Sequence, residues 1–309
     1  MKRNIITWAS ILAVAISSCA FAGEDVKSGL RYSITVSKFD NKAGWSGQWD
    51  IGDAWGAVMT DALQGSGKFI VLGEKDMRGE ALQEQDLVAS GRTAGGKRAP
   101  KTGQLTPAQL LVKGDITHVQ SSTAGGEGGL SFKGIRLGGA KDTAEINATI
   151  YLVDSQTGEV KASTKVVGKA GRKGLSVGYS GSALGGLGGD LDGFKKDNVG
   201  KACEDAVGQA VQFLVKQLDK IPWEGTVVSS KNGKVIINRG SREGVAVDQA
   251  FSVGTLEETK DPDSGEVLDS SVSKVGKIVV KTVKEKISIC EATEGGDKIE
   301  AKMSVMPAE

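Results

Sequence analysis

The chain has 309 residues, of which 39% are hydrophobic and 25% are charged, and its formal net charge is +1. This composition is typical of a globular protein, and the length predicts two domains. The near-neutral charge argues against nucleic acid as a partner, since nucleic-acid-binding domains carry a basic patch. Glycine is unusually frequent, with 44 residues, and most of the excess falls in two blocks.

The first 22 residues are predicted to be a secretion signal. Lys2 and Arg3 form a short basic region, and an apolar stretch that is too short to span a bilayer follows. Two cleavage sites compete. The sequence AFA predicts a mature chain that begins at Gly23, whereas the lipobox ISSC predicts lipidation of Cys19. Either outcome places the protein in the cell envelope, and we expect no transmembrane helix after the signal.

The next part, residues 23–222, is predicted to be an α+β or α/β domain. Short apolar or alternating runs predict strands at Arg31–Phe39, Lys68–Leu72, Val112–Gln120, Thr143–Asp154 and Val160–Val167. Apolar residues at three- and four-residue spacing, or capping signals, predict helices at Ile51–Leu63, Lys75–Ala89, Leu105–Leu111 and Val199–Leu218. Gly158 is expected to supply a positive φ in the turn between the last two strands.

Beyond Pro222 the pattern changes to short strands only. The sequence KNG predicts a hairpin turn at Asn232 and Gly233, and four further strands follow. Residues 223–309 are therefore predicted to form a small all-β barrel or sandwich. Cys203 and Cys290 fall in different predicted domains, so two buried thiols are favoured over a disulfide.

Motifs for catalysis or metal binding are weak, and we predict no enzyme activity, no cofactor and no metal. His118 is the only histidine and lies in an alternating strand, which favours a structural role. The sequence GGLGGDLDG resembles one calcium-binding β-roll repeat, but Asp192 occupies its apolar position and neighbouring repeats are missing. Asp261–Glu266 resembles the start of an EF-hand loop, yet its glycine comes one position early, so a turn is expected.

Two groups of charged residues have plain interpretations. Glu204 and Asp205 are expected on an exposed helix face. A basic loop is expected to be solvated, with contact to anionic lipid as the alternative; its residues are Arg92, Lys97, Arg98 and Lys101.

The two glycine-rich blocks alternate with the period of a strand. Leu130 and Phe132 fall on one face of the first block, and Leu175, Val177 and Tyr179 fall on one face of the second. An apolar face opposite a small polar face is the signature of a membrane β-strand. Two hairpins cannot close a barrel, so several copies would have to share one. A pair of soluble loops remains the alternative, because glycine lowers strand propensity.

The order of these parts resembles the curli production assembly/transport component family, the CsgG-like outer-membrane secretion channels. The resemblance is carried by YSITVSKFDN, LTPAQLLVKGDITHVQ, LVDSQTGEV and VGKACEDAVGQAVQFLV, within roughly residues 30–218. It implies a periplasmic domain that oligomerises into a ring. Each protomer then donates two hairpins, about Ser121–Asn147 and Lys161–Asp197, to a shared outer-membrane barrel.

In the curli channel, the loop after the first strand narrows the pore with aromatic and amide side chains. The matching segment is Asn41–Asp50, and its position gives Trp45 and Trp49 that role; the alternative is that both cover the helix at Trp55. The glycine-rich blocks have fewer large apolar residues than the channel's hairpins. The domain from Trp223 onward is absent from the curli channel and resembles the C-terminal domain of flagellar assembly protein T, which suggests a docking module.

These features predict a non-enzymatic, ring-forming component of the outer membrane and periplasm. It would serve as a secretion channel or accessory ring for extracellular fibre subunits. Its expected partners are copies of itself, the secreted subunits or other envelope proteins, and the outer membrane. The alternative is a soluble or lipid-anchored periplasmic protein that braces another envelope machine, such as the flagellar basal body.

Overall fold

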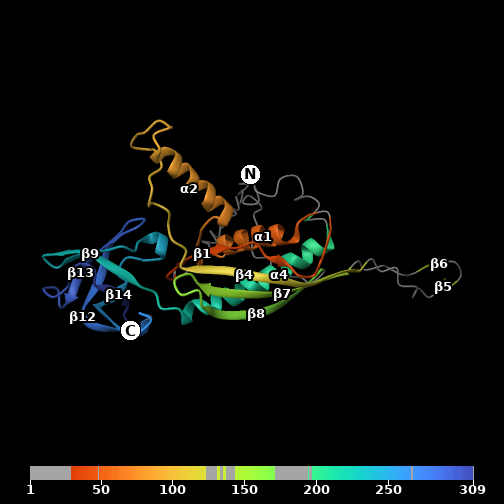
Figure 1. The fold of residues 1–309 in the computed structure, drawn as a ribbon. Helices are drawn as coiled ribbons and strands as arrows, with labels where there is room; N and C mark the ends of the chain where they lie inside the picture. The colour runs from red at the N-terminus through yellow and green to blue at the C-terminus, as the bar shows by residue number, and fades with distance from the viewer. Residues whose placement is uncertain are drawn as a thin grey trace, which may run out of the picture.

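A computed structural model describes residues 29–47, 49–122, 131–132, 135–136, 143–170, 194, 197–265 and 267–308. Within these residues, the chain forms an α/β part with a mixed sheet and, after it, a closed β-barrel (Figure 1). The predicted fold classes of both parts are confirmed.

One sheet forms the base of the α/β part. Its strands are β1 (Tyr32–Val36), β2 (Asp40–Asn41), β3 (Phe69–Val71), β4 (Leu110–Ser122), β7 (Thr143–Asp154) and β8 (Val160–Lys169). Their order is β3-β1-β4-β7-β8, and β2 pairs with β4. β1 is parallel to β3 and β4, whereas β7 is antiparallel to β4 and β8.

The first and the last of the α-helices cover one face of this sheet. The helical elements are α1 (Ile51–Gly65), α2 (Lys75–Ala89), α4 (Asn198–Gln217) and the 3₁₀ turn η1 (Leu218–Lys220). α1 and α4 contact each other, and α4 lies against β7 and β8. Every second residue of β7 is buried: Ala144, Ile146, Ala148, Ile150 and Leu152. Burial of each large aliphatic side chain stabilises the fold by about 1.5–3 kcal/mol.

The predicted helix at Leu105–Leu111 is wrong. Leu110 pairs with Ile34 and begins β4, in parallel with β1. The segment before it is fixed by β1, since the Ser33 hydroxyl donates to the Pro107 carbonyl at 2.8 Å. The Ser33 backbone N–H also donates to the Gln109 side chain at 3.0 Å. A helix of two turns is marginal by itself, so pairing with a buried strand prevails over the capping pattern.

The remaining elements of the α/β part confirm the predicted order. α2 and β7 have the predicted bounds, and Gly158 has a φ of 75° in the β7–β8 turn. Between β4 and β7 lie β5 (Ser131–Phe132) and β6 (Ile135–Arg136), which pair antiparallel. Side-chain positions within β5 and β6 are not described, so which way Phe132 faces stays a prediction.

The second part is a six-stranded closed barrel. Its elements are β9 (Gly225–Lys231), β10 (Lys234–Ile237), η2 (Ser241–Glu243), β11 (Ala250–Lys260), β12 (Val267–Val283), β13 (Ser288–Glu294) and β14 (Ser304–Pro307). The strands close in the order β10-β13-β12-β11-β14-β9. Asn232 and Gly233 have φ values of 51° and 73°, as the predicted hairpin turn requires.

Two further predictions are confirmed. The segment from Asp261 is a turn, in which the Asp261 carboxylate accepts hydrogen bonds from the backbone N–H groups of Asp263 and Ser264. Cys203 and Cys290 are free buried thiols. Burial raises the pKa of Cys203 well above its usual value and that of Cys290 to about 12, which disfavours the thiolate form in both.

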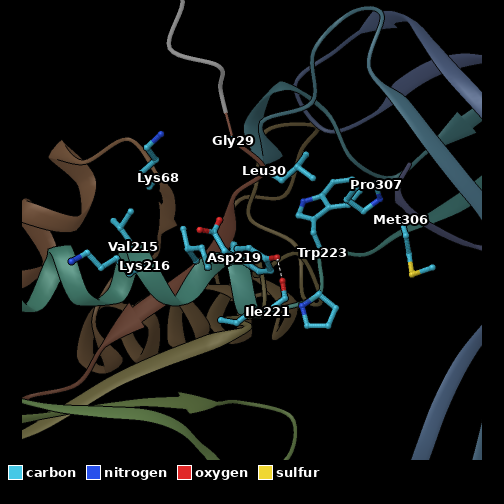
Figure 2. Close-up of a pocket in the computed structure, with 13 residues that line it drawn as sticks. Gly29, Leu30, Lys68, Val215, Lys216, Asp219, Ile221, Trp223, Met306 and Pro307 are labelled. Carbon is cyan, nitrogen blue, oxygen red and sulfur yellow. Dashed lines mark hydrogen bonds between the residues drawn. The ribbon is translucent and has the colours of Figure 1, made fainter. Parts of the chain in front are cut away.

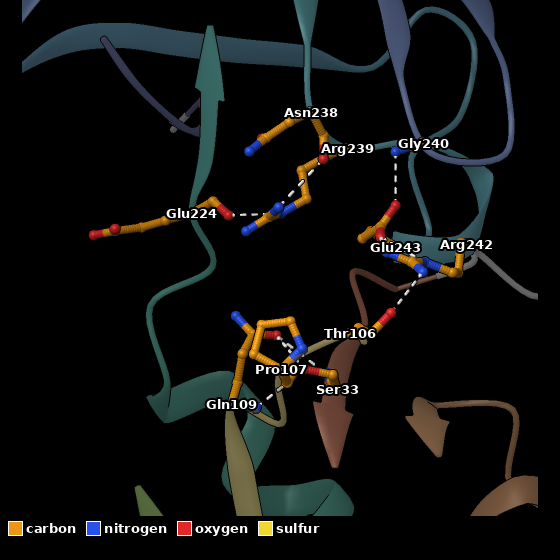
Figure 3. A network of polar contacts seen from close by, with 10 residues as sticks. All are labelled: Ser33, Thr106, Pro107, Gln109, Glu224, Asn238, Arg239, Gly240, Arg242 and Glu243. Carbon is orange, nitrogen blue, oxygen red and sulfur yellow. Dashed lines mark hydrogen bonds and ion pairs between the residues drawn. The ribbon is translucent and has the colours of Figure 1, made fainter. Parts of the chain in front are cut away.

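Side-chain and backbone hydrogen bonds join the barrel to the start of β1. The Arg31 backbone N–H donates to the Glu243 carbonyl at 2.9 Å. Just before the barrel, the Tyr32 hydroxyl donates to the Ile221 carbonyl at 2.5 Å and so fixes the segment that leads into it. Arg242 donates to the Thr106 hydroxyl at 3.4 Å and forms an ion pair with the buried Glu243 carboxylate at 2.7 Å (Figure 3). The barrel therefore lies at the end of the sheet opposite β5 and β6 (Figure 1).

A cavity of about 650 Å³ separates the two parts beside this joint (Figure 2). Leu30 and Val215 line it from the α/β part, and Met306 and Pro307 line it from the barrel. Trp223, at the start of the barrel, also lines it and stacks on Phe251, with ring centroids 5.2 Å apart. The joint thus combines polar contacts with apolar packing, since the buried apolar residues of both parts belong to one cluster.

We predict that Tyr32→Phe changes how stability depends on alkaline pH. Burial and the nearby Asp219 carboxylate raise the Tyr32 pKa from 10.0 to about 12 in the folded protein. Below pH 10 both states keep the proton; between pH 10 and about 12 the unfolded state loses it first, so stability falls. Tyr32→Phe should reduce this fall and, at neutral pH, lower the free energy of unfolding by about 1 kcal/mol.

Urea unfolding across this pH range measures both effects. Tyr151→Phe is the matched control, because it removes a hydroxyl far from the joint and leaves Tyr32 in place. An equal alkaline fall in wild type and Tyr32→Phe would contradict the assignment.

Candidate functional site

Both glycine-rich segments leave the sheet from the same end. β4 and β8 run in the same direction, because each is antiparallel to β7. The first segment therefore follows the end of β4, and the second follows the end of β8 and returns at the start of α4. β1 is parallel to β4, so the segment after β1, which contains Asn41–Asp50, lies at this end too. β5 and β6 lie beyond it (Figure 1).

The loop Asn41–Asp50 is held in a defined conformation by its own side chains. The Asn41 amide donates to the Trp45 carbonyl at 2.7 Å and accepts from the Trp45 backbone N–H at 3.2 Å. The Trp45 ring lies over Gly47, where a Cβ atom would come within 1.9 Å of the indole. The loop is therefore built around the half-buried Trp45 ring.

Trp49 anchors the far end of the loop in the core. Its side chain is only 8% exposed, and its ring centroid lies 4.5 Å from that of Trp45. It also makes an edge contact with Phe194, at 4.9 Å between centroids. Phe194 precedes α4, so this contact connects the loop to the point where the second glycine-rich segment returns.

Charged groups fix the loop to α1. The Asp50 carboxylate caps α1 by accepting from the Gly52 and Asp53 backbone N–H groups at 2.8 and 2.9 Å. Lys38 bridges Asp50 and Asp53 at 3.2 and 2.8 Å. Burial alone would raise the pKa of Asp50, but the hydrogen bonds from the Asp53 N–H and Lys38 outweigh it and lower that pKa. The hydrogen bond to Asp53 is the main cause of a raised Lys38 pKa.

A second ion pair ties the loop to the sheet. Lys42 lies 2.8 Å from Asp115 on β4, and this hydrogen bond raises the pKa of Lys42. β2 pairs with β4 at the same place, through Asp40 with Asp115 and Asn41 with Ile116. β2 is parallel to β4, so the loop continues from this point toward the end of β4 that the first glycine-rich segment follows.

Glycine allows α4 to approach the sheet where β8 ends. A Cβ atom at Gly168 would lie 1.9 Å from the Ala202 carbonyl oxygen, and one at Gly200 would lie 2.0 Å from the Phe194 carbonyl oxygen. Asp205 strengthens this contact, since its carboxylate accepts from the Lys169 backbone N–H at 3.0 Å. These two glycines therefore serve close packing.

The structure places the predicted site residues as follows. It brings Trp45 and Trp49 together, while Trp55 stacks on Phe39 at 5.3 Å. Their place in a pore stays a prediction. Phe132 lies in β5. Cys19, Leu130, Leu175, Val177 and Tyr179 lie outside the described residues, as does Asp192.

The other residues that were considered from the sequence have ordinary structural environments. His118 is exposed on β4, next to a bulge. The expectation of an exposed face for Glu204 and Asp205 is wrong: both are half-buried, and Asp205 also accepts from Gln209 at 3.1 Å. Sequence reasoning missed Phe194, although a single large aromatic residue before the α4 cap, Asp197, was a usable signal. No cluster of three or more metal-ligating side chains occurs in the described part of the chain.

None of the helices that the structure describes is long and apolar enough to cross a membrane. The structure thus has an α/β part followed by a β-barrel. The two glycine-rich segments follow strands that end on the same side of the sheet.

The chain matches one known protein family over most of its length. The model of the curli production assembly/transport component CsgG matches residues 24–246, so the chain belongs to that family. The match continues past Pro222 and includes β9 and β10. The proposed relation of the barrel to flagellar assembly protein T stays a prediction.

Several solved structures are distantly similar. The PelC dodecamer from Paraburkholderia phytofirmans is 13% identical, covers 59% of this chain and 85% of its own, and has a TM-score of 0.30. A hypothetical protein from Chlamydia trachomatis is 12% identical, with 62% and 99% coverage and a TM-score of 0.34. A lipoprotein from Neisseria meningitidis is 16% identical, with 62% and 99% coverage and a TM-score of 0.26. Likenesses at this level carry no information about assembly or partners. A search of curated proteins gave no match.

We predict that Trp49 and Trp45 differ in their contribution to stability. Trp49→Ala removes a buried ring that contacts two aromatic neighbours and should lower the free energy of unfolding by about 3 kcal/mol. Trp45→Ala removes a half-buried ring, whereas the Asn41 hydrogen bonds to its backbone remain, so about 1 kcal/mol is expected. Denaturant unfolding measures both, and equal losses would show that Trp49 is not the anchor.

We also predict that Gly168→Ala destabilises the protein by about 1–3 kcal/mol, because the added methyl group would force α4 away from β8. Gly96→Ala is the matched control, since a Cβ there meets nothing within 4 Å. Thermal unfolding of the two variants provides the comparison; an unchanged melting temperature for Gly168→Ala would show that the helix can move without loss.

Proposed function

We propose that this protein is a ring-forming component of the outer membrane and periplasm, and that it acts as a secretion channel or accessory ring for extracellular fibre subunits. One observation carries the proposal. In a chain of the CsgG family, both glycine-rich segments leave one end of the sheet, next to a loop that two tryptophans fix in place.

The physical argument concerns backbone hydrogen bonds. A two-stranded hairpin in lipid leaves its outer edges unpaired, which is tolerated only when neighbouring hairpins complete the ladder. Two hairpins from each copy, at about Ser121–Asn147 and Lys161–Asp197, would meet this requirement in a ring of copies. The position of both segments at one end of the domain lets every copy face the membrane in the same way.

Transport through such a ring is passive in this proposal. The loop Asn41–Asp50 lies where the segments leave the sheet and would form the narrowest point, with Trp45 as the more exposed of its two rings. The mechanism requires neither nucleotide hydrolysis nor a cofactor, because the path itself is the function.

A periplasmic brace is the second candidate. The observation that favours it is the barrel at the end of the sheet opposite β5 and β6. In a brace the glycine-rich segments would remain outside the membrane, and residues 223–309 would bind the partner machine.

We predict that Val177→Arg impairs membrane insertion by roughly 2–4 kcal/mol, because an arginine on the lipid side of a strand is costly near the midplane. Ser176→Arg, on the predicted opposite face, is the matched control and should be tolerated. The measurements are the native mass of the protein from separated outer-membrane and periplasmic fractions, followed by single-channel conductance of the membrane form.

A large oligomer in detergent extract of the outer membrane, lost in Val177→Arg and retained in Ser176→Arg, supports the channel. A monomer or small oligomer in the soluble periplasm contradicts it and favours the brace. Equal conductance of Val177→Arg and wild type would show that the strand assignment is wrong.

A further inference from the structure

The barrel carries a projecting ribbon whose strands pair only with each other. β11 pairs with β14 through Phe251–Gly254, and β12 pairs with β13 through Lys277–Val283. Beyond these contacts, Thr255–Lys260 pairs with Val267–Ser273 and, among the described strands, with no other. We call these two strand segments and the turn Asp261–Gly265 the arm.

The arm has one polar and one partly apolar face. On the polar face, the Ser273 hydroxyl donates to the Glu257 carboxylate at 2.7 Å. On the other face, Leu256 lies opposite Val272. Leu268 lies at a shift in the pairing register nearer the turn. Leu256 and Leu268 are 39% and 60% exposed. A two-stranded ribbon is marginally stable in water, and unpaired edges with apolar side chains are suited to a protein partner.

The charge of the arm is strongly acidic. Its described residues contain one lysine, Lys260, and five acidic residues: Glu257, Glu258, Asp261, Asp263 and Asp269. All of these residues except the half-buried Asp261 are exposed, so their field acts outward and favours a basic surface.

A basic groove of complementary character lies on the same barrel. It has a volume of about 400 Å³ and is lined by Lys234, Lys281, Ile289 and Ala292, together with one acid, Glu291, whose carboxylate lies 3.9 Å from the Lys281 ammonium. Further exposed lysines lie close in sequence on the neighbouring strand ends: Lys231, Lys284 and Lys286. The groove therefore combines apolar side chains with positive charge, as the arm combines apolar side chains with negative charge.

Geometry prevents the arm from reaching the groove of its own barrel. The base of the arm, Ser273, and the groove residue Lys281 lie on one strand, β12, about 25 Å apart at the usual rise per residue. The arm extends along that strand away from Lys281. A contact between the two surfaces must therefore join different molecules.

We infer that the arm of one copy docks in the lysine groove of a second copy of this chain. The two surfaces differ, so the contact is heterologous, and repeated contacts build a closed ring or an open chain. This inference rests on the proposed ring, to which it adds a specific contact between neighbouring barrels.

The first test reverses charges in the mature full-length protein. Asp263→Lys with Asp269→Lys on the arm, and Lys234→Glu with Lys281→Glu in the groove, should each raise the protein concentration for half assembly by about tenfold. Combining all four changes should restore assembly, because opposite charges again face each other. Asp297→Lys with Glu300→Lys, elsewhere on the barrel, makes the same change in net charge as the arm variant and should have no effect.

The second test is a cross-link between Asp263→Cys and Lys234→Cys in one chain, with a short bismaleimide. A heterologous contact yields a ladder of covalent dimers, trimers and higher species, and each single variant shows the background from native thiols. If wild type forms rings but the charge variants assemble normally and no ladder appears, the arm contact is wrong and the proposed function stands. If wild type is monomeric in every fraction, the proposed ring and the arm contact both fail.

Discussion

The burial of one sheet face is the constraint on which the α/β part depends. β4 and β7 place every second side chain against the helices, and α4 lies close enough to β8 to exclude a Cβ atom at Gly168. This packing determines where α4 must begin, at its cap Asp197, and so brings the second glycine-rich segment back beside β8. Strand direction then sends both segments off the same end. The common exit is therefore a consequence of core packing and requires no contact between the segments.

The aromatic loop depends on the same packing. Trp49 contacts Phe194, which lies directly before α4, so the helix that covers the sheet also supports the loop. The ion pairs of Lys38 and Lys42 orient the loop but contribute little to stability, because the two lysine side chains are largely exposed. A change that moves α4 would thus affect the loop and the return of the second segment together. The loop Asn41–Asp50, Phe194 and the start of α4 therefore behave as one structural unit.

The sequence predicts local elements well and long-range contacts poorly. Lys75–Ala89 and Thr143–Asp154 match the structure because their patterns and boundaries are local. Leu105–Leu111 fails because the parallel partner of Leu110 lies far away in the sequence, at Ile34. Trp45 and Trp49 are identified through the family's loop, but the contact of Trp49 with Phe194 joins distant segments and has no periodic signal. The arm could not be predicted either, because the alternation of residues along one strand does not show where the strands paired with it end.

The two proposed contacts act at opposite ends of each copy. A ring held only by membrane hairpins would fix neighbouring copies at one end and leave their angle free to vary. A second heterologous contact between barrels, beyond the far end of the sheet, would fix that angle at two separated places. A fixed angle is what allows repeated heterologous contacts to close into a ring of one size. The joint between the start of β1 and the barrel would then matter for assembly, because the hydrogen bonds of Arg31 to Glu243 and of Arg242 to Thr106 help to set how the barrel is held relative to the sheet.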